Sequence, residues 1–83
     1  MLNVIQAKYI KDYQIEIVFN DKVRGIVDLK NIIKNDHRPI FQELKDQKKF
    51  CKIKVDMDTI VWENGADLAP ESLYELLLTT NQK

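Results

Sequence analysis

The hydrophobic and polar residues of the segment 13–20 alternate strictly along the chain. One side carries Tyr13, Ile15, Ile17 and Phe19, and the other carries Gln14, Glu16, Val18 and Asn20. A period of two, with β-branched and aromatic residues, is typical of a β-strand with one buried face. The segments 4–10 and 23–29 have the same strand character, and the connections at 11–12 and 20–22 are short. The pattern therefore predicts an antiparallel three-stranded meander over residues 4–29.

Helical spacing replaces the alternation after this meander. Leu29, Ile32 and Ile33 are spaced as on a single turn of helix. Pro39 suits the first position of a second short helical segment, because its missing N–H would have no intrahelical partner there. The inner side of that segment is expected to carry Ile40, Phe41 and Leu44. Phe50 is the one apolar residue of the stretch 46–50, and we expect it to anchor a loop or a helical turn.

A second hairpin is predicted by the alternation that returns at Cys51, Ile53 and Val55. This alternation places the Cys51 side chain on the inner face of its strand. The turn-like segment 56–59 follows, and the segment 60–63 forms the return strand. Asn64-Gly65 ends that strand, since Asn and Gly adopt positive φ at low cost.

The last predicted element is a helix over residues 70–78. Pro70 suits its first position, Glu71 adds favourable charge to its first turn, and Asp67 is expected to reach the free amides at its start. The apolar stripe of this helix is formed by Leu73, Leu76 and Leu77. The predicted fold class is α+β: an antiparallel three-stranded meander plus a second β-hairpin, with short helical segments between them and a C-terminal helix. A chain of 83 residues cannot build two cores, so residues 1–83 are expected to form a single α+β domain.

Composition narrows the class of protein. Apolar residues make up 45% of the chain and charged residues 31%, which are ordinary values for a globular protein. No run approaches the ~20 apolar residues that cross a bilayer, and the N-terminus lacks the basic and apolar regions of a secretory signal. The single cysteine excludes an internal disulfide and fits a reducing compartment. We therefore expect a cytoplasmic protein without a membrane partner.

The formal net charge is zero, which argues against a dedicated nucleic-acid or membrane-surface binder. The charge is nevertheless segregated, because residues 42–54 hold five lysines and two acidic residues, whereas residues 55–83 hold one lysine and six acidic residues. The basic cluster consists of Lys45, Lys48, Lys49, Lys52 and Lys54. Two interpretations of this cluster stay open. One is contact with single-stranded nucleic acid or phosphate, and the other is protection of an exposed strand edge against aggregation.

Several segments resemble, in order along nearly the whole chain, a bacterial family known as domain of unknown function 2442. They are residues 13–21, 27–29, 39–46, Phe50 and above all 60–74, with the sequence IVWENGADLAPESLY. The family usually carries a glycine in the first hairpin, where this chain has Lys22. A lysine costs about 1 kcal/mol more than a glycine at positive φ, so the geometry of this turn is in question. The resemblance implies a small α+β fold with no established activity.

The resemblance also bears on partners. Members of this family are often encoded beside a second small protein, in an arrangement that resembles a toxin–antitoxin gene pair. The resemblance therefore implies an antitoxin-like role for this chain. Some relatives carry a name that links them to molybdopterin guanine dinucleotide synthesis, but this chain lacks a glycine-rich nucleotide loop and has Gly25 and Gly65 as its only glycines. The resemblance implies no catalytic residue.

His37 and Cys51 are the candidates for catalysis. His37 would need an orienting partner and a nucleophile, and the sequence offers only its neighbour Asp36. Cys51 is flanked by Lys49 and Lys52, which would favour a reactive thiolate. Its inward position in the predicted strand indicates an inert core residue instead. We therefore expect no catalytic residue and no enzyme activity.

Oxygen ligands for a hard metal ion are offered by Asp56 and Asp58, with Asn64 and Asp67 further along the chain. Their spacing lacks the pattern of a calcium-binding loop. Aspartates in a hairpin turn also hydrogen-bond their own backbone and need no metal. We expect neither a metal nor a cofactor.

Trp62 and Tyr74 have a structural and a functional interpretation. The structural one makes Trp62 a core residue, and the functional one makes either ring an exposed anchor for a partner. The candidate contact residues are Lys48, Lys49, Lys52, Lys54, Trp62 and Tyr74. The leading hypothesis is a protein-interaction module with a protein partner or self-association. The alternative is a nucleic-acid-binding or autoregulatory domain that uses the Lys45–Lys54 cluster.

Overall fold

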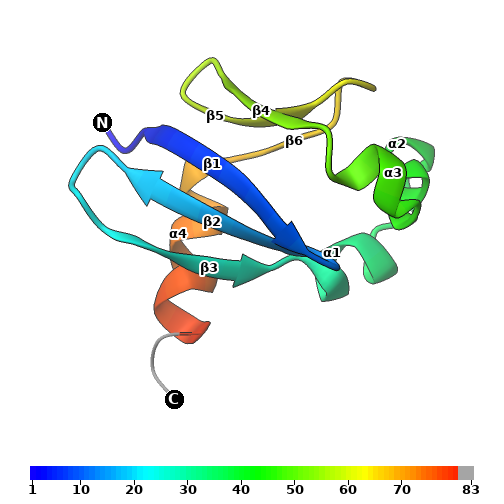
Figure 1. The fold of residues 1–83 in the computed structure, drawn as a ribbon, viewed down its shortest axis with the longest axis horizontal. Helices are drawn as coiled ribbons and strands as arrows, with labels where there is room; N and C mark the ends of the chain where they lie inside the picture. Colours follow the sequence, from blue (N-terminus) through cyan, green and yellow to red (C-terminus); the bar gives the residue numbers. More distant parts are fainter. Residues whose placement is uncertain (81–83) are drawn as a thin grey trace.

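The computed structural model describes residues 1–80, and Figure 1 follows the chain through its elements. The strands are β1 (Val4–Lys11), β2 (Gln14–Phe19), β3 (Arg24–Asp28), β4 (Ile53–Asp56), β5 (Thr59–Trp62) and β6 (Asp67–Leu68). The helices are α1 (Lys30–Asn35), α2 (Pro39–Gln42), α3 (Gln47–Phe50) and α4 (Pro70–Thr80), with the 3-10 helix η1 (Glu43–Lys45) between α2 and α3. These elements confirm the predicted α+β class.

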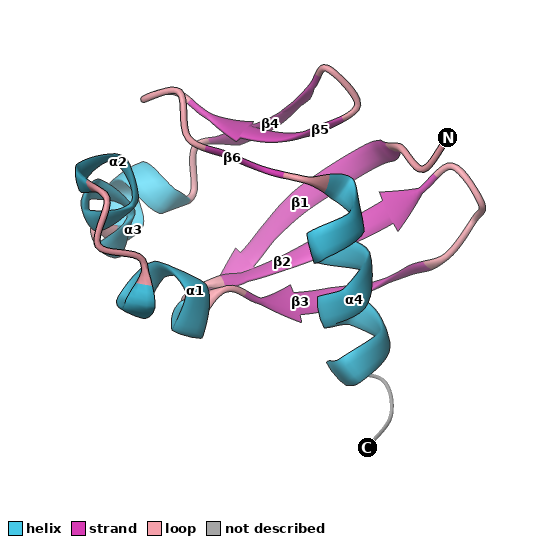
Figure 2. Ribbon diagram, turned by 180° about the vertical axis from the view of Figure 1, so that it is seen from behind, coloured by secondary structure: helices cyan, strands magenta, loops and turns pink. Residues whose placement is uncertain are grey.

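The first sheet has the order β1-β2-β3 and is antiparallel throughout, as the alternation predicted. Ile15, Ile17 and Phe19 of β2 are fully buried. They belong to the same core cluster as Leu73 and Leu77 of α4, and α4 crosses behind the sheet in Figure 1 and in front of it in Figure 2. The polar side of the alternation lies on the opposite, outer face of the sheet. Burying one side of β2 therefore sets the register of the whole sheet.

The second sheet has the order β4-β5-β6. The predicted hairpin of β4 and β5 is confirmed, and β6 adds a short strand that the sequence pattern did not predict. A strand of two residues is too short to show a period. Asp67, expected at the start of the C-terminal helix, lies in β6 and pairs with Val61. The two sheets are joined where the main-chain N–H of Val4 donates to the carbonyl of Asp58 over 2.8 Å.

Three turns place non-glycine residues at positive φ, and the first is the β1–β2 turn, with a φ of 51° at Asp12. In the β4–β5 turn, φ is 50° at Met57 and 68° at Asp58, the pair of positive values that a two-residue type I′ hairpin requires. In the β2–β3 turn, φ is 73° at Lys22. Lys22 therefore adopts the left-handed conformation that favours glycine. The geometry of this turn was in question because the family usually has a glycine there, and the turn has positive φ at Lys22.

The chain around Cys51 differs from the prediction. The Asp46 carboxylate accepts a hydrogen bond from the main-chain N–H of Lys48 over 3.0 Å and starts α3. The main-chain N–H of Cys51 still bonds the carbonyl of Gln47, so Cys51 ends this helical turn and β4 begins only at Ile53. The Cys51 side chain is exposed. The predicted inward position of Cys51 is therefore wrong, because a capped helical turn occupies residues that the alternation assigned to a strand.

An aromatic group centred on Phe50 fills the space between the sheets. The Phe50 ring is fully buried, with ring centres 5.2 Å from Tyr13, 6.0 Å from Tyr9 and 5.7 Å from Trp62. The expectation that Phe50 anchors a helical turn is thus confirmed. Edge-to-face contacts with the two tyrosines add stabilisation beyond that from the area that the ring buries.

The C-terminal helix α4 has 11 residues and runs two residues beyond its predicted end. Leu73 and Leu77 are fully buried and Leu76 is half-buried, so the predicted apolar stripe is confirmed. Among the described residues, none of the helices combines the length and the hydropathy needed to cross a bilayer.

Candidate functional site

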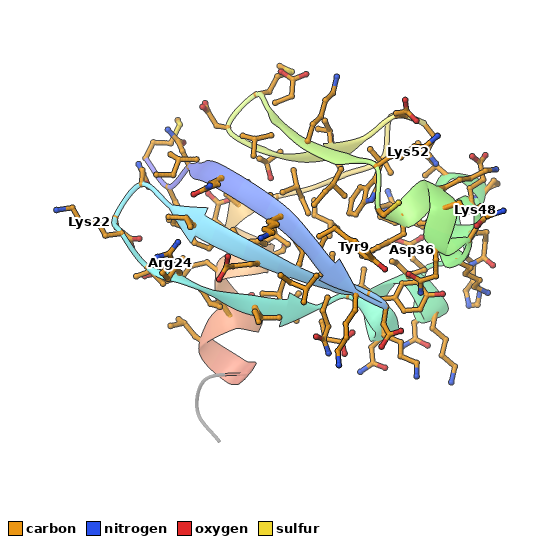
Figure 3. All side chains as sticks on the ribbon, viewed as in Figure 1. Tyr9, Lys22, Arg24, Asp36, Lys48 and Lys52 are labelled. Atoms are coloured by element: carbon orange, nitrogen blue, oxygen red, sulfur yellow. The ribbon has the colours of Figure 1, made fainter. Side chains whose placement is uncertain are left out.

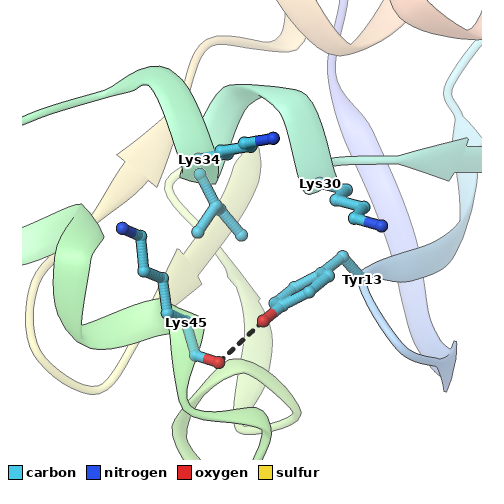
Figure 4. Close-up of a pocket in the computed structure, with 5 residues that line it drawn as sticks. Tyr13, Lys30, Lys34 and Lys45 are labelled. Atoms are coloured by element: carbon cyan, nitrogen blue, oxygen red, sulfur yellow. Dashed lines mark hydrogen bonds between the residues drawn. The ribbon is translucent and has the colours of Figure 1, made fainter.

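A small open pocket lies between the β1–β2 turn, α1 and η1. It is lined by Tyr13, Lys30, Ile33, Lys34 and Lys45 and has a volume of about 190 Å³. Figure 4 shows the side chains of Tyr13 and the three lysines arranged around it. Small-molecule sites usually enclose about 300–1,000 Å³, so this pocket suits one large side chain better than a whole ligand. It is called the lysine pocket below.

Tyr13 forms a fixed wall of the lysine pocket. Its hydroxyl donates a hydrogen bond to the main-chain carbonyl of Lys45 over 2.7 Å, as the dashed line in Figure 4 marks. Its ring packs edge-on against Phe50, with an angle of 82° between the ring planes. Because both ends of the side chain are held, a partner would not have to order this ring on binding.

The helix α1 supplies two of the three lysines. It begins after Asp28, whose carboxylate accepts a hydrogen bond from the main-chain N–H of Lys30 over 2.9 Å. Lys30 and Lys34 are four residues apart and therefore lie on the same side of the helix. Ile33, on the adjoining side, is 2% exposed and packs into the core. The burial of Ile33 thus sets the direction in which the two lysines project.

The lysine pocket carries a local positive charge. Among the side chains that the structure describes, Lys30, Lys34 and Lys45 take part in no ion pair. Lys30 also lines a neighbouring hollow with Asp12 and Asp28, so negative charge borders the pocket on that side. Lysine stems contribute apolar surface while their ammonium groups stay in water. The lysine pocket can therefore hold an apolar group that has negatively charged groups beside it, opposite the three lysines.

The lysine cluster expected from the sequence is divided by the fold. Lys45 belongs to the lysine pocket, whereas Lys49 and Lys52 line a second hollow together with two carboxylates. The ammonium of Lys49 lies 4.0 Å from Glu43, and that of Lys52 lies 3.7 Å from Glu63. Exposed pairs of this kind add little to stability, but they neutralise part of the positive charge of the cluster.

Lys48 and Lys54 are the remaining members of the predicted cluster, and both side chains are exposed. Lys48 belongs to α3 and Lys54 to β4, while Lys52 lies in the connection between them. Figure 3 shows Lys48 and Lys52 at the same end of the molecule, pointing outward. The five lysines therefore come from several elements and have different neighbours.

Trp62 and Tyr74 differ in their exposure. Trp62 is 2% exposed, and its indole N–H donates to the carbonyl of Phe50, so it is a core residue. Tyr74 is half-buried, with its ring edge-on to Phe19 at 5.0 Å between ring centres. Its hydroxyl donates to the Asp21 carboxylate over 2.9 Å, and this hydrogen bond raises the pKa of Tyr74. Of the two rings, Tyr74 alone keeps surface that a partner can reach.

His37 lies in an exposed loop. Its neighbour Asp36 is engaged by Arg38, with 2.7 Å between Nη2 and Oδ2 and 3.0 Å between Nε and Oδ1. This side-chain hydrogen bond lowers the pKa of Asp36. The Arg38 guanidinium also lies 4.6 Å from the centre of the Phe41 ring, which fixes its direction. Asp36 is thus oriented towards Arg38 and not placed to orient His37.

Of the aspartates considered as metal ligands, Asp58 lies in a turn, whereas Asp56 and Asp67 belong to strands. Asp56 closes β4, and Asp58 belongs to the β4–β5 turn, where its main-chain carbonyl accepts the bond from Val4. In the part of the chain that the structure describes, no three side chains of His, Cys, Asp or Glu come together in a way that could hold a metal ion.

Sequence reasoning missed the lysine pocket. Its other residues lie 17 to 32 positions after Tyr13, counted to Lys30 and Lys45, and its charge does not stand out in the composition. One signal was present, because Lys30 and Lys34 have the spacing that places two side chains on one side of a helix. Nothing in the sequence pattern indicated that α1, η1 and the β1–β2 turn lie together around one pocket.

The comparisons with known proteins give one match. A model of the family described as "Protein of unknown function (DUF2442)" matches residues 4–78. Neither the curated proteins nor the solved structures contain a match to this chain. The matched range runs from β1 into α4, so it contains every residue of the lysine pocket.

Proposed function

The chain belongs to the DUF2442 family, whose description assigns no activity, and we propose that it is a protein-interaction module. In this proposal the lysine pocket receives one apolar side chain from an acidic segment of a partner protein. The role is binding and not catalysis.

The main support for this proposal is the combination of features in the lysine pocket. Its volume of about 190 Å³ fits a single side chain, and Tyr13 is held in place by Lys45 and Phe50. Protein interfaces commonly have an apolar anchor at the centre and polar or charged groups at the rim. Three lysines around an apolar lining match this arrangement, with carboxylates of the partner as the complementary groups.

The partner that we propose is the second small protein that members of this family are often encoded beside. The role is then antitoxin-like, in that the chain neutralises this protein by covering part of its surface. An acidic segment on that protein would be drawn to the lysines, which raises the rate of association at low ionic strength.

The alternative role, nucleic-acid binding or autoregulation through the Lys45–Lys54 cluster, has weaker support. Two of these lysines lie beside carboxylates, Lys49 near Glu43 and Lys52 near Glu63. A phosphate backbone would have to compete with those carboxylates for the same ammonium groups. A matched pair of variants separates the two roles.

The experiment is co-expression of the chain with the tagged protein from the adjacent gene, followed by co-purification and a growth assay. The first variant is Lys30→Glu/Lys34→Glu/Lys45→Glu, which reverses the charge of the lysine pocket. We expect binding to weaken at least about tenfold, with loss of any growth rescue, since several attractive contacts become repulsive. Far-UV circular dichroism verifies that the variant is folded.

The control is Lys48→Glu/Lys52→Glu/Lys54→Glu, which changes the net charge by the same amount and leaves the pocket intact. We expect it to bind the partner as the wild type does. Equal weakening by both variants would contradict the proposal, because it would show a general effect of charge. Salt-sensitive binding of DNA or RNA that only the control variant loses would favour the alternative role.

A further inference from the structure

The strand β3 is an open edge of the first sheet. Within residues 1–80 it pairs with β2 and with no other strand, and Figures 1 and 2 show it as the outermost strand, with α4 crossing one face. An unpaired edge offers main-chain N–H and C=O groups to a further strand. The opposite edge is formed by β1. It faces the second sheet, to which the main-chain hydrogen bond from Val4 to Asp58 joins it.

The directions of the β3 main-chain groups follow from its hydrogen bonds to the neighbouring chain. At one end Leu29 donates to the carbonyl of Tyr13, and at the other Phe19 donates to the carbonyl of Val23. Since these groups alternate in direction along an antiparallel strand, the residues that face β2 are Val23, Gly25, Val27 and Leu29. The N–H and C=O groups of Arg24, Ile26 and Asp28 therefore point away from the sheet.

The side chains of the same three residues lie on the outer face of the sheet. Arg24 and Asp28 are exposed, and Ile26 is 42% exposed, while Val27 beside them is fully buried on the inner face. Figure 3 shows the Arg24 side chain next to β3, close to the β2–β3 turn. The edge therefore presents a cation, an apolar side chain and an anion in sequence order.

This order of cation, apolar side chain and anion is complementary to the same order on a second copy that runs in the opposite direction. If a second β3 pairs antiparallel about a two-fold axis at Ile26, each Ile26 lies opposite the partner's Ile26, and each Arg24 lies opposite the partner's Asp28. All three pairs have outward-facing main-chain groups on both sides, so the register is a hydrogen-bonded one. One Asp28 oxygen accepts the bond from Lys30, and the other is available to Arg24 of the second copy.

The two edges of the first sheet also differ in their protection. The β1 strand has register shifts at both ends, between Val4 and Gln6 and between Tyr9 and Lys11, and it carries Lys8. Bulges and lysines are the devices that keep an edge from pairing. The β3 strand has a regular register over its five residues and carries neither lysine nor proline.

From these observations we propose that the protein forms a two-fold symmetric dimer by antiparallel pairing of β3 with β3 of a second copy. The two first sheets then join into one six-stranded sheet with a helix α4 from each copy on the same face. This surface does not use the lysines of the pocket, so the inference goes beyond the proposed function. A pairing of five residues buries a small area, which places the dimer among weak, concentration-dependent assemblies.

Sedimentation equilibrium of the full chain between about 10 μM and 1 mM tests the dimer. We expect the mean mass to rise from one chain towards two across this range. Ile26→Pro should keep the protein monomeric, because it removes an N–H that points outward and leaves the bonds to β2 in place. Circular dichroism shows whether this variant keeps the wild-type fold.

Mixing of charge variants tests the register. Arg24→Glu alone and Asp28→Lys alone each place like charges opposite each other twice, so each should dimerise at least about tenfold more weakly than the wild type. A mixture of the two restores opposite charges at every position, and we expect heterodimers of wild-type strength. Restoration also shows that both variants are folded.

A position-specific cross-link gives an independent readout. In a Cys51→Ser background, Ile26→Cys should form a disulfide-linked dimer under mild oxidation, because paired Cα atoms on the axis lie about 5.5 Å apart. Ile5→Cys, at another exposed isoleucine of the same sheet, is the matched control and should not cross-link.

A monomer at every concentration would overturn the proposal. So would a dimer that survives Ile26→Pro in the folded state, or charge variants that fail to recover on mixing. The pocket variant Lys30→Glu/Lys34→Glu/Lys45→Glu should dimerise as the wild type does. Loss of partner binding and loss of the dimer are therefore distinguishable failures.

Discussion

The indole N–H of Trp62 donates a hydrogen bond of 2.9 Å to the main-chain carbonyl of Phe50, and the two rings lie 5.7 Å apart. Phe50 ends α3 and Trp62 ends β5, so this contact attaches the helical middle of the chain to the second sheet. Both residues are buried. The tryptophan of the family's most specific segment therefore has a structural role in the core.

Removing the indole should be strongly destabilising. Trp62→Phe leaves the Phe50 carbonyl buried without its donor, which costs about 1–3 kcal/mol, and creates a cavity that adds to the loss. We expect the free energy of unfolding to fall by about 2–4 kcal/mol in urea denaturation followed by circular dichroism. Tyr9→Phe, which removes only the half-buried hydroxyl bond to Gln47, should lose less. Equal losses would contradict the role given to the Trp62–Phe50 contact.

Lys22→Gly should stabilise the protein. Lys22 has a φ of 73°, where a side chain with a Cβ is strained by about 1 kcal/mol and glycine is not. We expect the free energy of unfolding to rise by about 1 kcal/mol in thermal and urea denaturation. Lys22→Ala is the control, since it removes the charge but keeps the Cβ. A gain of the same size in the alanine variant would assign the effect to charge.

The Tyr74–Asp21 hydrogen bond should make stability depend on alkaline pH. The hydrogen bond to Asp21, with desolvation and the charge of Asp21 as further causes, raises the pKa of Tyr74. A group whose pKa is raised by folding contributes stability that is complete below its unfolded pKa, about 10 for tyrosine, and is lost as the pH rises through the folded pKa. We expect the melting temperature to fall above about pH 10 more steeply than in Tyr74→Phe.

Titration of Tyr74 tests the same hydrogen bond to Asp21. The difference in phenolate absorbance between the wild type and Tyr74→Phe reports the ionisation of Tyr74, and its midpoint should lie above about 10. Asp21→Asn removes the negative charge while keeping an acceptor oxygen, so it should shift this midpoint downward. A midpoint at or below 10 in the wild type would refute the assignment.

Cys51 should react in the folded protein. Its side chain is exposed and its Sγ–H donates to the carbonyl of Lys48 over 3.4 Å. We expect one equivalent of thiol to react with a disulfide reagent without denaturant, at a rate within about tenfold of that in urea. Cys51→Ser should change the free energy of unfolding by less than about 0.5 kcal/mol. A thiol that reacts only after unfolding would contradict the observed exposure.

The strands and the C-terminal helix could be predicted because their patterns are local. The alternation of Ile15, Ile17 and Phe19 reports a single buried face wherever the strand is placed. Pro70 and the leucines that follow mark a helix in the same way. Cys51 was misplaced because its position in an alternation competed with a helical turn capped by Asp46. The two residues of β6 carried too little pattern for any prediction.

The candidate surfaces depended on contacts between distant segments. The lysines that are close in sequence, Lys45 to Lys54, have separate neighbours, and Lys45 instead meets Lys30 and Lys34 in one pocket. The complementarity of Arg24 and Asp28 across β3 is visible in the sequence, but it has meaning only when β3 is known to be an edge.

The sequence by itself determined the α+β class, the meander, the C-terminal helix and the family, because these follow from periodicity and short motifs that act over a few residues. The tertiary structure decided that Trp62 is buried, that Cys51 is exposed, and which lysines share a pocket. These features depend on how the two sheets and the helices between them pack together. Packing is a property of segments far apart along the chain, and no local pattern contains it.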